Sequence, residues 1–198
     1  MILDDFRIRM NSKGLNKQNT DQYLERGSNS LKLYLKKYLN TFDINDEHEF
    51  DFANQGVTLG DVILTGKIDK LQINQKTKTI IVTDYKTGQS ANKWSNSDAK
   101  LLNFRRQLCF YKILIENSNK YRGYKVEEGI IEYVEPDENN EIQKLRMTFD
   151  DETVNTTKQL IRKVWEHIQA LNFPDTSSYS KNSKGVLEFV DDILDSKI

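Results

Sequence analysis

The sequence has little of what marks several common classes of protein. It contains one cysteine, Cys109, among 198 residues. A single thiol excludes an intramolecular disulfide framework, and it excludes an iron–sulfur cluster or a zinc knuckle held by several cysteines. No apolar run approaches the roughly 18 residues that a membrane-spanning helix needs. We therefore expect neither a disulfide-stapled secreted domain nor a membrane protein.

An excess of charge of either sign is also missing. The 29 Lys and Arg residues nearly balance the 30 Asp and Glu residues, so the formal net charge is −1. Such a balance gives no bulk attraction to a polyanion, and any nucleic-acid surface would have to be a local basic patch. The N-terminal residues do not resemble a signal peptide, and no G-x-x-x-x-G-K-(S/T) phosphate loop occurs. We expect a cytoplasmic protein.

The sequence contains enough hydrophobic residues to form one core. Hydrophobic residues make up 37% of the chain, including nine Phe, nine Tyr and two Trp. A chain of this length can bury a substantial core in one domain. Residues 1–19 are polar, and we expect them to form a flexible N-terminal segment. Residues 20–198 are expected to form a single domain.

The spacing of apolar residues predicts alternating helices and strands. A helix is expected from about Thr20 to Leu39, and Gly27 within it suggests a close packing contact. Alternating patterns predict three strands that make an antiparallel meander, at 48–52, 61–73 and 79–86. Later patterns predict a helix at 97–116, strands at 126–134 and 143–149, a helix that opens at 150–152, and a helix or strand at 186–194. The predicted fold class is α+β, with helices packed on a central mixed sheet.

Charged residues lie on two of these strands where apolar residues would be ordinary. Asp84 and Lys86 are two apart and share a strand face, and the preceding hairpin brings Asp69 near Asp84. Charges on buried strands require pairing or a metal. Carboxylates suit a hard cation such as magnesium, and the lysine can orient a water or stabilise charge on a phosphate. Gly66 is expected to leave one side of this site open to a backbone.

A simpler interpretation exists for an isolated D-x-K pattern. Asp69 and Lys86 would then form a cross-strand ion pair, and Asp84 would cap a turn. The surrounding residues favour the first interpretation, because three motifs follow one another in a recognisable order. They are Gly66–Lys70, Val82–Gly88 and Gln107–Tyr111.

These motifs resemble those of the PD-(D/E)XK nuclease superfamily, and within it the RecB-like domain at the C-terminus of UvrD/Rep- and AddAB-type helicase–nucleases. Gly66–Lys70 resembles the G-x-(I/V)-D-(R/K) motif of that family, and Val82–Gly88 resembles its hydrophobic-D-Y-K-T-G motif. Gln107–Tyr111 resembles its Q-L-x-x-Y motif. The resemblance is close over residues 50–115 and looser up to Leu171.

The resemblance implies a restriction-endonuclease-like α+β core and a metal-dependent deoxyribonuclease. The implied activity is that of an exonuclease, as part of a helicase–nuclease in DNA repair or recombination. It implies that Asp69, Asp84 and the main-chain carbonyl of Tyr85 hold Mg²⁺ or Mn²⁺. Lys86 would be the catalytic lysine. The implied partners are DNA and a helicase domain, in cis or in a complex, with no membrane.

The following helix carries the supporting residues that the resemblance implies. Gln107 and Tyr111 lie one helical turn apart and would support the site or touch the DNA backbone. The alternative for these two is a hydrogen-bonded helix face under the sheet. Arg105 and Arg106 could contact phosphates, although a solvated helix edge is the simpler interpretation of either alone.

One family feature is missing. RecB-like domains usually add a histidine ligand from an N-terminal helix, in a G-x-x-x-H setting, and neither His48 nor His167 has that setting. Glu25, on the first predicted helix, is the candidate substitute. Two further hypotheses stay open: a catalytically weak or inactive nuclease-fold module that binds DNA or docks a protein, and a stand-alone restriction- or phage-type nuclease.

Overall fold

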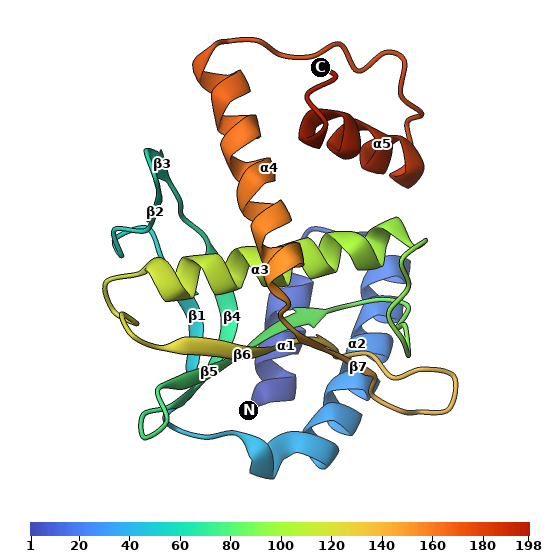
Figure 1. Ribbon diagram of the computed structural model, residues 1–198. Coiled ribbons are helices and arrows are strands. Elements are labelled where there is room, and N and C mark those ends of the chain that lie inside the picture. Colours follow the sequence, from blue (N-terminus) through green and yellow to red (C-terminus); the bar gives the residue numbers. More distant parts are fainter. The chain divides into compact units, whose positions relative to one another are not determined.

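A computed structural model describes residues 1–198 (Figure 1). The chain divides into two compact units, which are treated separately below. Unit 1 comprises residues 1–44, 85–92 and 132–145, and unit 2 comprises residues 45–84, 93–131 and 146–198. The elements are α1 Ile2–Asn11, α2 Lys17–Tyr38, a 3₁₀ turn Leu39–Thr41, β1 Glu47–Asp51, β2 Thr58–Leu59, β3 Val62–Ile63, β4 Lys67–Asn74, β5 Thr79–Lys86, α3 Ala99–Asn117, β6 Lys125–Tyr133, β7 Lys144–Thr148, α4 Asp151–Gln169 and α5 Ser183–Leu194.

Five strands form one sheet in the order β1-β4-β5-β6-β7, and β2 and β3 form a separate two-stranded sheet. β4 pairs antiparallel with both β1 and β5, which confirms the predicted meander. The four residues between β4 and β5 turn tightly, because Asn74 Oδ1 accepts hydrogen bonds from the backbone N–H groups of Lys76 and Thr77. Such a short connection fixes the register between the two strands.

β5 and β6 run parallel. The N–H of Lys125 donates to the carbonyl of Lys78 at 2.9 Å, and the N–H of Val134 donates to the carbonyl of Lys86 at 3.0 Å. Partners that advance together along both strands define a parallel pair, and α3 is the connection that such a pair requires. β7 returns beside β6, with the N–H of Tyr133 donating to the carbonyl of Gln143. The predicted α+β fold with a mixed sheet flanked by helices is confirmed.

α3 is the helix of unit 2 that lies against the meander (Figure 1). Asp98 caps its N-terminus by accepting hydrogen bonds from the N–H groups of Lys100 and Leu101, as an N-cap aspartate does. Its buried residues occupy successive turns, so one broad face is apolar. They are Ala99, Leu101, Leu108, Cys109, Tyr111, Ile113, Leu114 and Ile115. No helix of the chain combines the length and apolarity needed to cross a membrane.

The predicted strand at 61–73 is interrupted in the structure. Val62–Ile63 pairs back on Thr58–Leu59 as β3 and β2, and β4 starts only at Lys67. The N–H of Leu64 donates to the carbonyl of Val57, so the chain leaves the sheet direction before it enters β4. The alternating pattern carried no signal for this change of partner.

The N-terminal region of unit 1 also differs from the expectation of a flexible segment. Residues 2–11 form α1, and α2 starts at Lys17 behind an Asn16 cap, three residues before the predicted start. Gly27 makes the close contact that its position suggested, because a Cβ there would collide with the ring of Phe6. α1 therefore packs on α2 through a ring seated over a glycine.

Candidate functional site

Two carboxylates lie opposite each other on the central strands of unit 2. The β4–β5 register pairs Leu71 with Val82 and Lys70 with Thr83. One residue further along both strands, Asp69 comes opposite Asp84. Opposed residues of an antiparallel pair hold their Cβ atoms about 4.5–5.5 Å apart on the same face. Asp84 is 3% exposed and Asp69 is half-buried.

α3 supplies two donors to one oxygen of Asp84. The Gln107 amide and the Tyr111 hydroxyl each donate to Asp84 Oδ1, both at 2.8 Å. The Gln107 amide also donates to the Tyr111 hydroxyl at 2.7 Å, which closes a triangle of hydrogen bonds. The two donors reach one carboxylate because they lie at positions i and i+4 of the helix. Asp84 is therefore held in one orientation by neutral groups.

The electrostatics of Tyr111 reflect both aspartates. Burial raises the pKa of the Tyr111 phenol above its ordinary value, and the charge of Asp84 and the hydrogen bond to it raise it further. The charge of Asp69 raises the same pKa, so Asp69 acts on this cluster as well. Tyr111 remains a neutral hydrogen-bond donor at physiological pH.

Tyr85 and Lys86 end β5, immediately after Asp84, and belong to unit 1. Lys86 is half-buried, and its carbonyl accepts the N–H of Val134. The Tyr85 ring meets the Tyr34 ring edge-on, with centroids 6.3 Å apart. The turn that follows needs its glycine, because Gly88 has φ +90°.

Sequence reasoning missed the residue that holds this turn. Glu135 Oε1 accepts a hydrogen bond from the N–H of Gly88 at 2.9 Å, and the same carboxylate pairs with Arg26 of α2. Glu135 follows β6 and lies 47 residues beyond Gly88 in the sequence. No local pattern signals such a contact.

The two predicted phosphate-binding arginines make local contacts on α3. The Arg105 guanidinium donates to Asn96 Oδ1 at 2.7 Å and lies 5.1 Å from the centre of the Trp94 ring. Arg106 is half-buried and donates to Asn103 Oδ1 at 3.2 Å. Both arginines are thus oriented by neighbours, and their role toward phosphates stays a prediction.

The candidate substitute ligand, the two histidines and the one cysteine have different surroundings in the structure. Glu25 is an exposed residue of α2 in unit 1, and His48 is exposed on β1. His167 lies on α4 with its Nδ1 3.0 Å from the carbonyl oxygen of Asn172. Cys109 is buried between helices, and burial raises the pKa of its thiol to about 11. No three His, Cys, Asp or Glu side chains gather as a metal-binding group.

Gly66 does not leave space beside the acidic pair, as the sequence had suggested. A Cβ at this position would lie 2.8 Å from Leu114 Cδ1 and 3.4 Å from Phe110 Cε1. Side chains of α3 therefore fill the space that the glycine provides. Its missing side chain allows the helix to approach β4, and the prediction of an opening for a nucleic-acid backbone here is wrong.

The mixed sheet, the α3 connection and the carboxylates on β4 and β5 are consistent with a restriction-endonuclease-like fold, the fold of a class of nucleases. The chain belongs to the PD-(D/E)XK nuclease superfamily, whose family model matches residues 9–180. The superfamily assignment drawn from the three motifs is therefore confirmed.

The chain is also similar to solved structures. The crystal structure of SSO0001 is 21% identical to this chain with a TM-score of 0.42, and the match covers 91% of this chain and 79% of that one. No curated protein matches the chain.

Proposed function

We propose that this chain is a metal-dependent deoxyribonuclease that hydrolyses phosphodiester bonds of DNA. The observation that supports it most directly is the pair formed by Asp69 and Asp84 on adjacent strands. Like charges directly opposite each other destabilise a sheet. Asp84 is also held rigidly by Gln107 and Tyr111, as a ligand that must keep its position would be.

The donor set fits a small hard cation. Mg²⁺ is commonly held by one or two carboxylates, with waters and substrate phosphate oxygens completing its octahedron. Asp69 and Asp84 would supply the carboxylates, and the carbonyl of Tyr85 would be a further oxygen ligand. No additional cluster of side chains is needed for such a site. When bound, Mg²⁺ or Mn²⁺ would polarise the scissile phosphate as a Lewis acid.

The remaining roles follow from the chemistry of each side chain. The Lys86 ammonium would stabilise the negative charge that develops on the phosphate oxygens. Gln107 and Tyr111 would fix Asp84 by donating to Oδ1, which leaves the ligating electron pairs of the carboxylate in a defined direction. Arg105 and Arg106 would bind flanking phosphates.

The finer assignment to RecB-like exonucleases is supported by the motifs. The D-Y-K-T-G and Q-L-x-x-Y patterns occur in the order of helicase–nuclease domains. We infer that the chain acts on DNA ends, together with a helicase in cis or in a complex, in repair or recombination.

A cleavage assay tests the function. Linear and circular DNA, single- and double-stranded, would be incubated with Mg²⁺, Mn²⁺ or EDTA. We expect metal-dependent loss of the linear DNA and survival of the circles. Lys86→Ala should lower the rate at least about 100-fold, as loss of a group that stabilises transition-state charge does. Lys76→Ala, in the exposed β4–β5 loop, is the matched control and should cut normally.

Two outcomes would overturn parts of the proposal. Cleavage that survives Lys86→Ala unchanged would remove the assigned site. Absence of cleavage with every metal, combined with salt-sensitive DNA binding, would indicate a module that keeps the fold for binding alone.

A further inference from the structure

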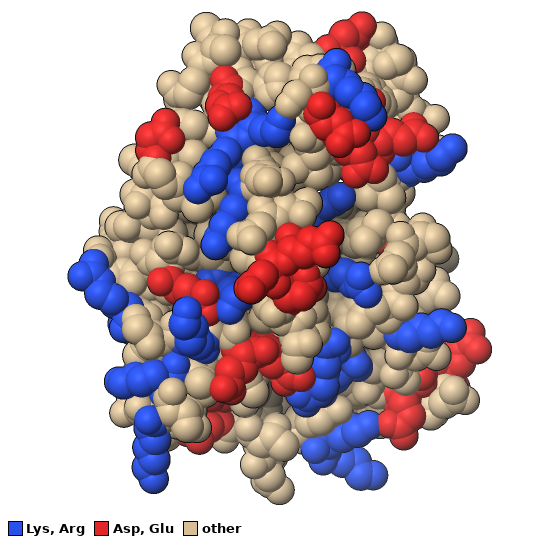
Figure 2. All heavy atoms as spheres, viewed as in Figure 1, with Lys and Arg blue, Asp and Glu red and all other residues tan.

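The sequence carries nearly equal numbers of basic and acidic residues. On the face drawn in Figure 2, Lys and Arg side chains are interspersed with Asp and Glu side chains, in keeping with the net charge of −1. A polyanion must therefore be recognised locally. One local feature stands out within unit 1, a groove between α2 and the residues that follow β6.

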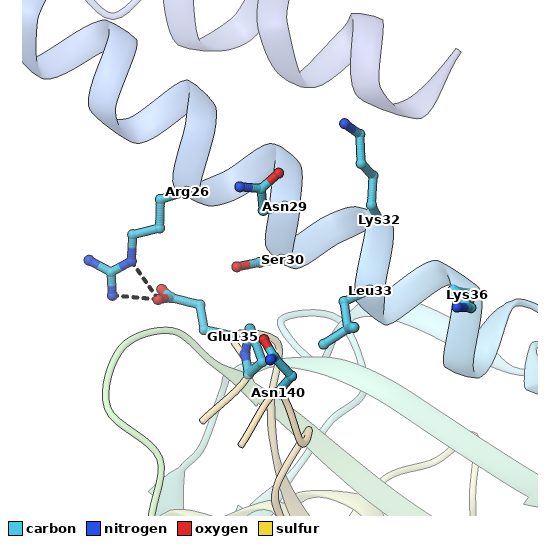
Figure 3. Close-up of a pocket in the computed structure, with 9 residues that line it drawn as sticks. Arg26, Asn29, Ser30, Lys32, Leu33, Lys36, Glu135 and Asn140 are labelled. Atoms are coloured by element: carbon cyan, nitrogen blue, oxygen red, sulfur yellow. Dashed lines mark hydrogen bonds and ion pairs between the residues drawn. The ribbon is translucent and has the colours of Figure 1, made fainter. Parts of the chain in front are cut away.

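The groove has a volume of about 690 Å³, and most of the residues that line it are polar or charged (Figure 3). Leu33 and Pro136 are its only hydrocarbon side chains. Three cations and one carboxylate line it, so the lining carries a net charge of +2. The lining residues are Arg26, Asn29, Ser30, Lys32, Leu33, Lys36, Glu135, Pro136 and Asn140.

The cations of the groove are suited to bind an anion. Lys32 and Lys36 are exposed and make no hydrogen bond or ion pair within the chain. Arg26 is ordered by Glu135, which occupies its Nε and one terminal nitrogen. A guanidinium has five N–H donors, so Arg26 keeps donors for a second acceptor. Pre-ordering of this side chain lowers the entropy lost on binding.

The spacing of the cations indicates an extended ligand. An α-helix rises about 1.5 Å per residue, so Arg26 and Lys36 lie about 15 Å apart along α2. This distance is several times the size of one phosphate group, so the cations could contact successive phosphates of one strand. A single phosphate could engage only one end of such a row.

The lining also indicates what part of a nucleic acid is bound. No aromatic side chain lines the groove, so it offers no ring on which a base could stack. Its lysines and its Asn29 and Asn140 amides suit phosphate and sugar oxygens. A groove of this kind binds backbone and reads no sequence.

We propose that this groove of unit 1 binds the sugar–phosphate backbone of a single nucleic-acid strand through Arg26, Lys32 and Lys36. The inference deepens the proposed function, since the strand would be a segment of the nuclease substrate outside the bond that is cut. Arg26 and Glu135 would connect the bound strand to Gly88, in the turn that follows Lys86.

Binding of a fluorescein-labelled oligothymidylate, followed by anisotropy in EDTA, tests the proposal without cleavage. The variant is Lys32→Ala/Lys36→Ala, and the control is Lys76→Ala/Lys181→Ala, two exposed lysines outside the groove. Both pairs lower the net charge by two. Loss of two phosphate contacts should reduce the slope of log K against log[salt] by about 1.4 and weaken binding by roughly 10- to 30-fold near 0.1 M salt. The control should keep the wild-type slope.

The same data contain the results that would overturn the inference. An unchanged slope in the groove variant, or an equal loss in the control, would show that the groove holds no strand. Inorganic phosphate that displaces the oligonucleotide as well as an unlabelled strand, at equal phosphate concentration, would show a single-phosphate site instead. Thermal unfolding of both variants establishes that they are folded.

Failure of this inference is distinguishable from failure of the proposed function. A wild-type protein that cuts DNA, with a groove variant that binds like wild type, would refute the groove alone. A wild-type protein that cuts nothing with any metal, with a reduced slope in the groove variant, would refute the nuclease function alone.

Discussion

The two faces of the β4–β5 strand pair carry different arrangements of charge. On one face, Lys70 forms an ion pair with Asp46 at 2.9 Å, and both side chains are less than a tenth exposed, at 8% and 5%. On the other face, the register brings Asp69 opposite Asp84. Asp69 therefore lies opposite a residue of like charge, whereas the next residue of the strand, Lys70, pairs with a residue of opposite charge.

The comparison sets a structural ion pair, Lys70 with Asp46, against two aspartates for which we propose a function. Lys70 and Asp46 balance each other, so their face has no need of a ligand for neutrality. The opposed aspartates gain from a cation that lies between them. The sequence motif places Asp69 and Lys70 together, but the strand geometry directs their side chains to opposite faces of the sheet.

Removal of Lys70 should have the largest effect on folding. Lys70→Ala leaves Asp46 buried without its cation, and loss of one partner of a buried pair costs about 3–5 kcal/mol. Urea unfolding of the metal-free protein measures the free energy. Lys67→Ala, which removes an exposed pair with Glu49, is the control and should cost much less, because solvent screens an exposed pair. Equal losses of stability in the two variants would show that the buried Lys70–Asp46 pair matters no more than an exposed ion pair.

Metal ions should stabilise the folded protein by binding on the face that carries Asp69 and Asp84. A ligand present at 100 times its dissociation constant adds about 2.7 kcal/mol to the free energy of unfolding. We expect Mn²⁺ to give such an increment to the wild type and to Lys70→Ala, and to give none to Asp84→Asn. Thermal unfolding with and without Mn²⁺ measures it. An increment that persists in Asp84→Asn would place the cation elsewhere.

The hydrogen bonds from α3 should matter more for metal affinity than for stability. Tyr111→Phe removes one donor to Asp84, and loss of a group that orients a ligand costs about 10–100-fold in metal affinity or activity. The Mn²⁺ concentration for half-maximal cleavage should rise accordingly. Tyr124→Phe, which removes a hydroxyl bonded to Lys78, is the control. A shift of the same size in the control would deny Tyr111 a specific role.

A substitution at Gly66 tests how tightly α3 packs against the start of β4. Gly66→Ala adds a methyl group against Leu114, and overpacking of this kind costs about 1–3 kcal/mol. Shortening the neighbour in Gly66→Ala/Leu114→Val should recover part of the loss. Urea unfolding of the single and double variants gives the coupling energy. Additive losses would mean that the two side chains do not meet.

Sequence reasoning succeeded where neighbours in space are also neighbours along the chain. The predicted bounds of the 79–86 strand match β5, and the short loop before it fixes the register that opposes Asp69 and Asp84. Alternating apolar residues indicate which face of a strand is buried. A short hairpin loop then determines which residues of the two strands lie opposite each other. The supporting positions Gln107 and Tyr111 followed from a motif resemblance and from helical spacing.

The contacts that the sequence did not reveal join distant segments. Leu114 fills the space beside Gly66, and Glu135 holds the N–H of Gly88. A glycine can mark either open space or close packing against a neighbouring element. The sequence alone could not decide between these two for Gly66. The α1 helix was missed because it has no buried residue and its Ile2 and Ile8 are exposed, so no buried apolar stripe marks it in the sequence.

The four-residue loop between β4 and β5 also has a consequence for the order of folding. A hairpin of this kind closes in about 1–10 μs, whereas pairing across a long connection is slow because more chain must be ordered first. Asp69 and Asp84 are therefore brought together early, and Gln107 and Tyr111 reach Asp84 only when α3 docks. During that interval the two carboxylates repel each other without their final donors. Divalent cations should therefore accelerate refolding as well as stabilise the folded chain.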